Sequence, residues 1–337
     1  MEQPITIGVD LAKSVFQLHG IDAEGAVVLR RQVRRSQMLE VFRNLQPCLV
    51  GMEACAGAHY WARALGRFGH EVRLMPPSYV KPYVRRGKTD QADAAAICEA
   101  VTRPSMRFVP VKSEATQALL LTHKAREFLV RQLTQVTNAI RAHLGEFGIV
   151  AAKGVHNVGR LLDAGERANL PASARGPLRL LADQFFQTRE KIDALTREIR
   201  REAEASPSAR RLRTIPGIGP ITATALVATL PDVTGFRSSR DLSAWLGLTP
   251  KPHSSGGKER MGRISKMGNR YLRRLLYLGA IGVITSRRRG QPGEDWLWRL
   301  LQRKTAKQAA IALANRMARI VWALMKNGTD YEAARAA

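Results

Sequence analysis

Hydrophobic and polar positions alternate along the first hundred residues in a way that predicts strands and helices in turn. Apolar runs predict strands at Ile5–Asp10, Val15–Ile21 and Ala26–Val33, with turns short enough for an antiparallel meander. Beyond the meander, a helix pattern, a strand, a helix and a strand follow over residues 36–45, 48–53, 59–68 and 71–75. A further helix contains Asp90 and Asp93. These patterns predict a mixed sheet flanked by helices over residues 1–112.

The order of these elements, three meander strands and then strand–helix units, is that of an α/β ribonuclease H-like fold. From about residue 113 to 205 the apolar positions fall three and four apart, as at Leu133, Val136 and Ile140. This spacing predicts two long helices packed as an antiparallel coiled-coil hairpin or an oligomer seam, with a tip over Ala151–Gly176. An ordinary helical-bundle core would produce the same stripe.

The remaining residues, 206–337, are predicted to be mainly helical. Helices are expected at Ala223–Leu230 and Gln302–Lys326. Before the first of these helices, Pro216-Gly217-Ile218-Gly219 resembles the hairpin of a helix-hairpin-helix DNA-binding module. Gly217 and Gly219 would let backbone N–H groups approach a phosphate at a helix N-terminus. A simple tight turn is the commoner cause of such a tetrapeptide.

The charge of the chain points to a polyanionic partner. Lys and Arg number 54 against 28 acidic residues, the net charge is +26 and the isoelectric point is about 11.1. Such a field attracts nucleic acid in a salt-dependent way, although a merely basic protein or one at an anionic membrane surface would share it. Aromatic residues make up only 6% of the chain, so no base-stacking platform can be named.

Cysteine spacing and hydropathy indicate the cellular compartment in which the protein is expected. Cys48, Cys55 and Cys98 form no Cys-x-x-Cys pair, which argues against a disulfide framework or a zinc finger. No uncharged apolar run of about 20 residues occurs, and no signal peptide precedes the first predicted strand. We therefore expect a cytoplasmic protein that does not enter a membrane.

Four carboxylates are placed as metal ligands would be. Asp10 and Glu53 each close an apolar strand, and Asp90 and Asp93 lie three residues apart on a predicted helix. Strand ends and one helix face can converge on a point, and hard oxygen ligands suit Mg²⁺ or Mn²⁺. In so basic a chain, the set predicts a metal site that acts on a phosphodiester. Taken singly, each acid also fits a helix cap or a surface charge.

A loop of serine and glycine precedes a cationic stretch. Ser254 and Ser255 lie in Ser-Ser-Gly-Gly, between His253 and Lys258. A serine hydroxyl attacks phosphorus only where a base, a metal or cations lower the cost of the developing charge. By composition alone the two serines are ordinary loop residues. The cations expected to bind nucleic acid here are Lys258, Arg263, Lys266, Arg270, Arg273 and Arg274.

Four motifs follow one another along nearly the whole chain: Gly8–Lys13, Met52–Gly57, Lys88–Ala94 and the block from Pro216 to Arg274. Together they resemble the DEDD transposases of insertion-sequence family 110. The resemblance implies a RuvC-like catalytic domain, a helical coiled-coil domain and a C-terminal transposase domain with the serine loop. Their expected bounds are 1–112, 113–205 and 206–337.

The resemblance also implies a mechanism. A member of this family excises and inserts a mobile element, guided by a structured noncoding bridge RNA that the element encodes. The implied Mg²⁺ ligands are Asp10, Glu53, Asp90 and Asp93. Ser255, with Ser254 as its nearest rival, would form a covalent 5′-phosphoserine bond to double-stranded DNA. A homo-oligomer, dimer to tetramer, is expected, with dimer contacts from the helical middle.

Other functions stay open at this point. A RuvC-like metal-dependent junction nuclease would hydrolyse DNA with water at the same four acids and would need no serine. A non-catalytic nucleic-acid-binding protein would use the hairpin and the arginine clusters alone. A sugar-kinase-like ATPase shares Gly-Val-Asp after a strand, but a second phosphate loop rich in Gly and Thr is not evident.

Overall fold

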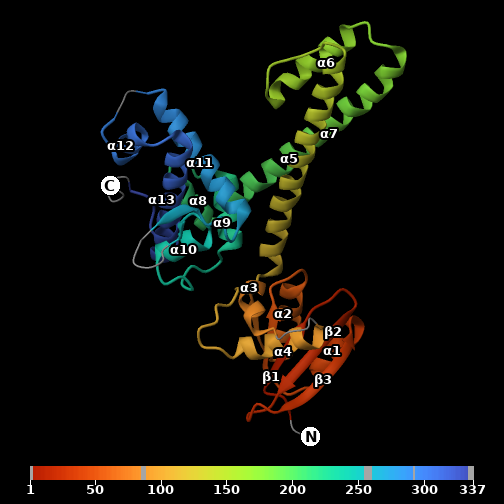
Figure 1. The fold of residues 1–337 in the computed structure, drawn as a ribbon, viewed down its shortest axis with the longest axis vertical. Coiled ribbons are helices and arrows are strands. Elements are labelled where there is room, and N and C mark those ends of the chain that lie inside the picture. Colours follow the sequence, from red (N-terminus) through yellow and green to blue (C-terminus); the bar gives the residue numbers. More distant parts are fainter. Residues whose placement is uncertain (1–2, 85–88, 254–259, 291–292, 333–337) are drawn as a thin grey trace. The chain divides into compact units, whose positions relative to one another are not determined.

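The computed structural model describes residues 3–84, 89–253, 260–290 and 293–332 (Figure 1). Contacts concentrate within two units, Met1–Ala115 and Thr116–Ala337. Among the helices of the described residues, none combines the length and the apolar character needed to cross a membrane.

The first unit is built on a five-stranded mixed sheet with the order β3-β2-β1-β4-β5. β2 pairs antiparallel with β1 and β3, whereas β4 pairs parallel with β1 and β5. The predicted meander and the mixed sheet are therefore confirmed. The strands are β1 (Thr6–Asp10), β2 (Val15–Ile21), β3 (Val27–Arg34), β4 (Leu49–Glu53) and β5 (Glu71–Met75).

Alternation along β1 decides which face of the sheet meets which helices. Ile7 and Val9 point to one face, where they are fully buried in a core. That core is shared with α1 (Met38–Arg43) and α2 (Ala58–Gly66). Burying apolar side chains on this face is the main stabilising contribution to the unit.

Gly8 points to the opposite face, which α4 (Asp90–Val101) covers. A β-carbon at Gly8 would overlap the backbone of Ala94 and would lie 2.8 Å from the Cα atom of Cys98. Because glycine has no such carbon, the helix packs directly on the central strand. Shorter elements of this unit are α3 (Pro77–Val80) and the 3-10 turns Arg35–Gln37 and Lys81–Tyr83.

The second unit begins with two long helices, α5 (Glu114–Glu146, which starts in the first unit) and α7 (Ala172–Ala205). The guanidinium of Arg126 on α5 donates to the hydroxyl of Thr196 on α7 at 2.8 Å. The apolar stripes of both helices pack in one core, as the predicted hairpin requires. The segment predicted to form the tip, residues 151–176, contains a helix of its own, α6 (Val158–Arg167), and the 3-10 turn Val155–Asn157.

The rest of this unit consists of helices α8 to α13, which share one hydrophobic core, and a small, largely exposed hairpin. The helix predicted at Gln302–Lys326 is confirmed from Ala306 onward and differs only at its start: Gln302 and Arg303 end the preceding helix, and Thr305 caps a new one with a capping box. The elements are α8 (Pro207–Arg213), α9 (Pro220–Thr229), α10 (Ser239–Trp245), β6 (Pro250–Pro252), β7 (Met261–Ile264), α11 (Arg270–Arg288), α12 (Trp296–Arg303) and α13 (Ala306–Asn327).

Candidate functional site

Asp10 and Glu53 end neighbouring parallel strands. Val9 pairs with Met52 in the ladder between β1 and β4, so the residues that follow them emerge side by side at the carboxyl ends of the strands. Both carboxylates are half-buried, whereas Val9 and Met52 are fully buried. Apolar strand interiors thus deliver two carboxylates to one edge of the sheet, as predicted.

Negative charge at this edge of the sheet affects the pKa of the Cys55 thiol. Burial raises the pKa of Cys55, and the carboxylates of Glu53 and Asp10 raise that pKa further. A raised pKa disfavours the thiolate, which is the nucleophilic form of cysteine. The same negative field favours a cation.

The helix α4 carries the other two acids, Asp90 and Asp93, in its first turn. Thr89 caps this helix, because its hydroxyl oxygen accepts a backbone N–H at 3.1 Å. Carboxylates in a first turn are stabilised by the helix dipole, which is an ordinary structural role. Asp93 directly precedes Ala94, the residue whose backbone crosses Gly8 on β1.

The four acids lie as two pairs. Within the described residues, no group of three or more His, Cys, Asp or Glu side chains lies close enough together to hold a metal ion. Like charges repel, so gathering both pairs requires a cation between them. The pair at the sheet edge supplies the hard oxygen donors that Mg²⁺ or Mn²⁺ prefers. The complete ligand set stays a prediction.

The residues on either side of the serine loop form a hairpin that the sequence patterns did not reveal. β6 pairs antiparallel with β7, and the N–H of His253 donates to the carbonyl oxygen of Arg260 at 2.7 Å. Ser254, Ser255 and Lys258 fall between these two residues in the sequence and lie outside the described residues. Strand pairing on both sides brings the two ends of the loop together.

Two glycines close the base of this hairpin. Gly247 and Gly268 both have a φ of 70°, a left-handed conformation that favours glycine. A β-carbon on Gly247 would overlap the backbone of Met267, and one on Gly268 would overlap that of Trp245. The chain segments on either side of the serine loop therefore cross in direct backbone contact.

Arg273 joins this crossing to α11. Its guanidinium donates to the carbonyl oxygens of Leu246 at 2.9 Å and Met267 at 2.8 Å. Burial, and then the charge of Arg270, lower the pKa of Arg273. The contacts of Arg273 give it a structural role at the hairpin base, beside its predicted role in nucleic-acid binding.

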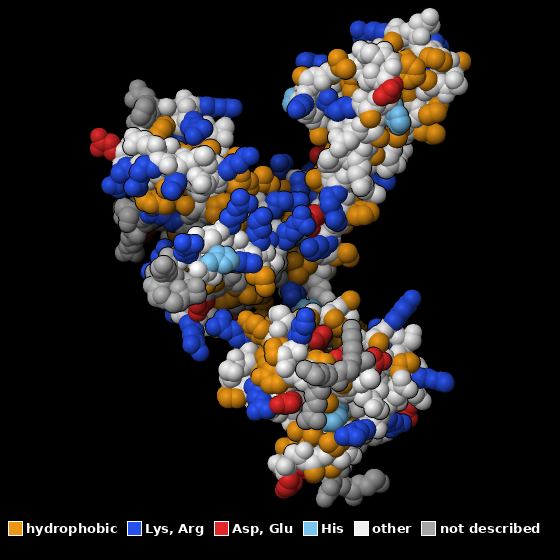
Figure 2. Space-filling model, in the orientation of Figure 1, with side chains coloured by type: hydrophobic (Ala, Val, Ile, Leu, Met, Phe, Trp, Pro, Cys, Tyr) orange, Lys and Arg blue, Asp and Glu red, His pale blue; other side chains and the backbone are white. Residues whose placement is uncertain are grey.

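The other described cations of this segment differ in their surroundings. Arg274 forms an ion pair with Glu127 at 3.6 Å. Arg263, Lys266 and Arg270 are exposed. Figure 2 shows Lys and Arg side chains gathered on the second unit in the region of α9 and α11. Arg263, Lys266 and Arg270 therefore offer exposed positive charge in the segment that follows the serine loop in the sequence.

The Pro-Gly-Ile-Gly turn connects α8 to α9. Gly217 has a φ of 87°, and a β-carbon there would lie 2.8 Å from the carbonyl oxygen of Gly279 on α11. Gly219 is exposed, precedes the first residue of α9 and has open space around it. The first glycine thus serves packing, while the second leaves a helix N-terminus accessible to a phosphate.

Comparison with known proteins shows what the chain is related to. Residues 7–149 match the IS110 DEDD transposases, and residues 209–294 match the "Transposase IS116/IS110/IS902 family". The chain is 40% identical over 327 residues to the transposase for insertion sequence element IS1328 of Yersinia enterocolitica, covering 96% of this chain and 98% of that protein. The chain belongs to the IS116/IS110/IS902 family of transposases.

Further relatives of this IS110-family transposase agree. The transposase for insertion sequence element IS1111A of Coxiella burnetii is 38% identical over 329 residues, covering 96% of this chain and 90% of that protein. A pilin gene-inverting protein of Moraxella bovis is 25% identical over 273 residues, covering 78% of this chain and 75% of that protein. As an insertion-sequence transposase, the protein is an enzyme that cuts and rejoins DNA.

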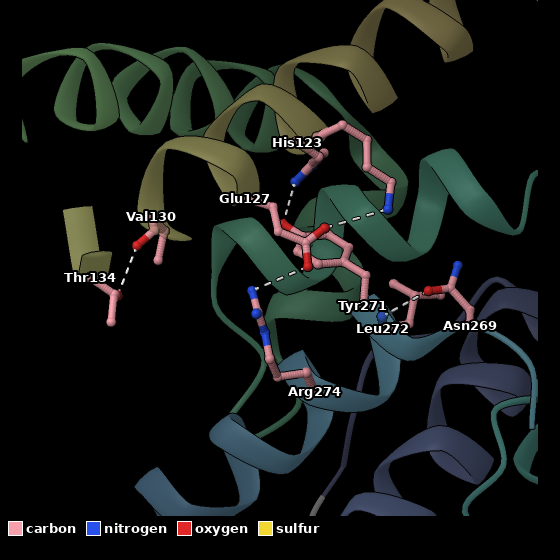
Figure 3. A network of polar contacts seen from close by, with 9 residues as sticks. His123, Glu127, Val130, Thr134, Asn269, Tyr271, Leu272 and Arg274 are labelled. Atoms are coloured by element: carbon pink, nitrogen blue, oxygen red, sulfur yellow. Dashed lines mark hydrogen bonds and ion pairs between the residues drawn. The ribbon is translucent and has the colours of Figure 1, made fainter. Parts of the chain in front are cut away.

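The transposase also contains a buried polar network that the sequence patterns missed (Figure 3). Nδ1 of the fully buried His123, on α5, lies 3.1 Å from the hydroxyl of Tyr271, and Nε2 lies 3.0 Å from that of Thr224. Thr224 donates its proton to the carbonyl oxygen of Pro220 at 2.9 Å. Thr224 must therefore accept from Nε2–H, which leaves Nδ1 to accept from Tyr271.

This network joins α5 to α9 and α11. Burial lowers the pKa of His123 to about 4, with a smaller contribution from two neighbouring cations, so the ring is neutral at neutral pH. Glu127 adds an outer layer by pairing with Arg274 and, at 3.5 Å, with Lys124. Tyr271 and Thr224 lie 148 and 101 residues away from His123 in the chain, so no local pattern connects them.

Proposed function

We propose that this transposase joins itself covalently to DNA through Ser255 during transposition. The observation that carries this proposal is the place of the serine loop between β6 and β7, on a hairpin whose base Gly247 and Gly268 close by direct backbone contact. A loop on a rigid base can present a hydroxyl in a repeatable position. Exposed cations beside it can bind the DNA phosphates.

In the proposed step, the Ser255 hydroxyl oxygen attacks the phosphorus of a DNA phosphodiester. A serine–phosphorus ester bond forms while the bond from phosphorus to the 3′ oxygen breaks. The serine loses its proton and the departing 3′ oxygen gains one, which produces a 5′-phosphoserine and a free 3′-hydroxyl. Because the ester keeps the energy of the phosphodiester, another 3′-hydroxyl can attack it and rejoin the strands without ATP.

Asp10, Glu53, Asp90 and Asp93 are proposed to hold a divalent cation, Mg²⁺ or Mn²⁺. The half-buried pair at the sheet edge supports this assignment, because its hard oxygen donors suit these ions. When bound, such an ion polarises phosphoryl oxygens and lowers the pKa of an attacking hydroxyl. The first unit is accordingly proposed to be of RuvC type, and the turn at Pro216–Gly219 to act as a helix-hairpin-helix.

Guidance by a noncoding RNA is part of the proposal and rests on the family resemblance. The net charge of +26 supports it, because a strongly cationic surface binds RNA and DNA backbones alike. Base pairing with the RNA would read the target, and the protein would hold backbone and shape. The active form is proposed to be a dimer to tetramer in which the acidic site of one copy meets the serine of another, with the segment 113–205 supplying dimer contacts.

A denaturing-gel assay for a protein–DNA adduct tests the proposal. The reaction contains the element's ends, its flanking noncoding RNA and Mg²⁺, and compares wild type with Asp10→Ala, Ser255→Ala and the matched control Ser254→Ala. The proposal expects an adduct in wild type and Ser254→Ala that is absent from the other two variants. Adduct lost only in Ser254→Ala would move the nucleophile by one residue. Omitting the RNA should abolish the adduct.

A second candidate, a hydrolytic junction nuclease, is favoured by one observation. Asp10 and Glu53 form their pair within the first unit, without any residue of the serine loop. Water activated at such a site would cut DNA and leave no adduct. Cleavage that persists in Ser255→Ala would establish this function. DNA binding without cleavage, unchanged in Asp10→Ala, would establish a non-catalytic binding protein instead.

A further inference from the structure

A groove of about 790 Å³ opens at the edge of the first unit that carries Asp10. β1 ends at Asp10, and because the meander is antiparallel, β2 begins and β3 ends at this same edge. Its lining comes from the loop between β1 and β2, the end of β3 with the residues that follow it, and the start of α2. It is therefore a neighbour of the acidic pair and distinct from it.

Three cations line the groove: Lys13, Arg34 and Arg35, all exposed. None of the described residues that line it is acidic. Arg35 is held in place, because its backbone N–H donates to the carbonyl oxygen of Ser14 at 2.9 Å and its guanidinium donates to that of Lys13 at 3.4 Å. A lining with cations and no acids suits a phosphate backbone.

An aromatic side chain forms the rim of the groove. Tyr60, on α2, is 48% exposed. Its ring meets Trp61 edge to face at 5.1 Å between centroids, and Trp61 meets Phe16 in the same way at 5.2 Å. The guanidinium of Arg35 lies 5.3 Å from the Trp61 ring. The exposed ring is thus supported by a packed aromatic cluster, as a base-stacking platform requires.

We infer that this groove binds a single-stranded segment of the DNA on its way to Asp10 and Glu53. Tyr60 stacks on a base, while Lys13 and Arg34 contact the phosphates on either side. DNA is the expected occupant because Lys13 follows Asp10 by three residues, so a strand in the groove is also presented to the acidic pair. The inference rests on the proposed function only in taking that pair as the place of reaction.

Binding of a fluorescent oligothymidylate to the full-length protein tests the inference, without Mg²⁺ and in the Ser255→Ala background. Tyr60→Ala should weaken binding roughly 5- to 100-fold, the usual loss of one stacked base, and Tyr60→Phe should keep it. Tyr79→Ala is the matched control, because Tyr79 is another exposed tyrosine of the same unit, 44% exposed, and does not line the groove. Equal affinity in Tyr60→Ala and wild type, or an equal loss in Tyr79→Ala, overturns the inference.

Other exposed cations of the protein, such as Arg263 and Arg270, would also attract DNA, so a local readout accompanies the affinity. An oligonucleotide containing 5-iodo-deoxyuridine should photo-crosslink to the peptide that contains Tyr60, and Arg34→Gln should reduce that crosslink while Arg31→Gln, an exposed neighbour on β3, should not. Crosslinks elsewhere only would overturn the inference. An oligouridylate that outcompetes the DNA at Tyr60 would also overturn it, by assigning the groove to RNA.

The two proposals can fail independently. Loss of binding in Tyr60→Ala together with no adduct from wild type would leave the groove standing and remove the serine reaction. An adduct from wild type, with DNA binding unchanged in Tyr60→Ala, would support the serine reaction and overturn the inference about the groove.

Discussion

The backbone of Ala94 on α4 lies against the Cα atom of Gly8 on β1, closer than any β-carbon would allow. Through this contact the helix that carries Asp90 and Asp93 packs on the strand that ends at Asp10. The glycine in Gly-Val-Asp therefore lets the helix that carries one acidic pair pack directly on a strand that carries a member of the other pair.

Gly8→Ala should lower the free energy of unfolding of the first unit by about 2 kcal/mol or more, as overpacking against rigid backbone does. The atoms that the new carbon would meet belong to the backbone of α4, so no side chain can rotate away. Urea unfolding followed by circular dichroism measures the change. Gly66→Ala is the control, because open space surrounds Gly66 at the end of α2; a comparable loss there would contradict the explanation.

Gly279→Ala should destabilise the second unit by about 1–3 kcal/mol and weaken DNA binding, because its β-carbon would overlap the backbone of Gly217 and displace the turn before α9. Gly282 lies three residues further along α11 with open space around it, so Gly282→Ala should leave binding unchanged. Thermal unfolding and a DNA-binding titration on both variants check this. Identical behaviour of the two would show that the turn does not depend on this contact.

Arg273→Ala should lower the free energy of unfolding by about 1–2 kcal/mol, because two carbonyl oxygens at the hairpin base lose a charged donor. Arg270→Ala should leave stability unchanged and reduce the salt dependence of DNA binding, since Arg270 is exposed on the cationic surface. Chemical unfolding and DNA affinity at several salt concentrations separate the two roles. A stable Arg273→Ala protein with weakened binding would assign Arg273 to DNA alone.

Stability of the second unit should fall as the pH drops from about 6.5 to about 4. The pKa of His123 is lowered from 6.5 to about 4 in the folded protein, so the unfolded chain binds the proton first throughout this window. At about 1.4 kcal/mol per pKa unit, the loss from this residue amounts to about 3 kcal/mol at the lower end. Above pH 6.5 His123 is neutral in both the folded and the unfolded protein, so its contribution to the free energy of unfolding no longer changes with pH.

Urea unfolding at a series of pH values measures this slope. His123→Gln should be less stable at neutral pH but should lose less stability between pH 6.5 and 4 than wild type. His156→Gln, which removes an exposed histidine of the same unit, should keep the wild-type slope. The same slope in His123→Gln and wild type would show that another group dominates the acid sensitivity.

Local patterns predicted the first unit well. The apolar run that ends at Asp10 and the turn at Asp22–Gly25 are signals within a few residues, so the meander and the mixed sheet followed from them. The break before Thr305 was missed, because the amphipathic period continues on both sides and the capping box interrupts it locally. The hairpin of β6 and β7 was missed for a different reason: Pro, Ser and Gly dominate its sequence, and its pairing depends on the crossing at Gly247 and Gly268.

The candidate site divides in the same way. Asp10 and Glu53 were predicted to emerge together and do so, because parallel neighbours in a sheet end at one edge. The gathering of Asp90 and Asp93 with them, and the role of Ser255, stay predictions. Tyr60 was not predicted to be a stacking residue, since a composition with few aromatics says nothing of where one of them stands.

By itself the sequence determined the order of strands and helices, the membership in a transposase family and the class of chemistry. Hydrophobic period, charge and the order of motifs can all be read along the sequence without knowing which residues meet in space. Tertiary structure alone decided which distant residues meet. Tyr60 joins Lys13 and Arg34 around one groove, and His123 joins Tyr271 in one buried network. Such encounters arise from strand pairing and helix packing between segments far apart in the chain, and no local pattern of residues encodes them.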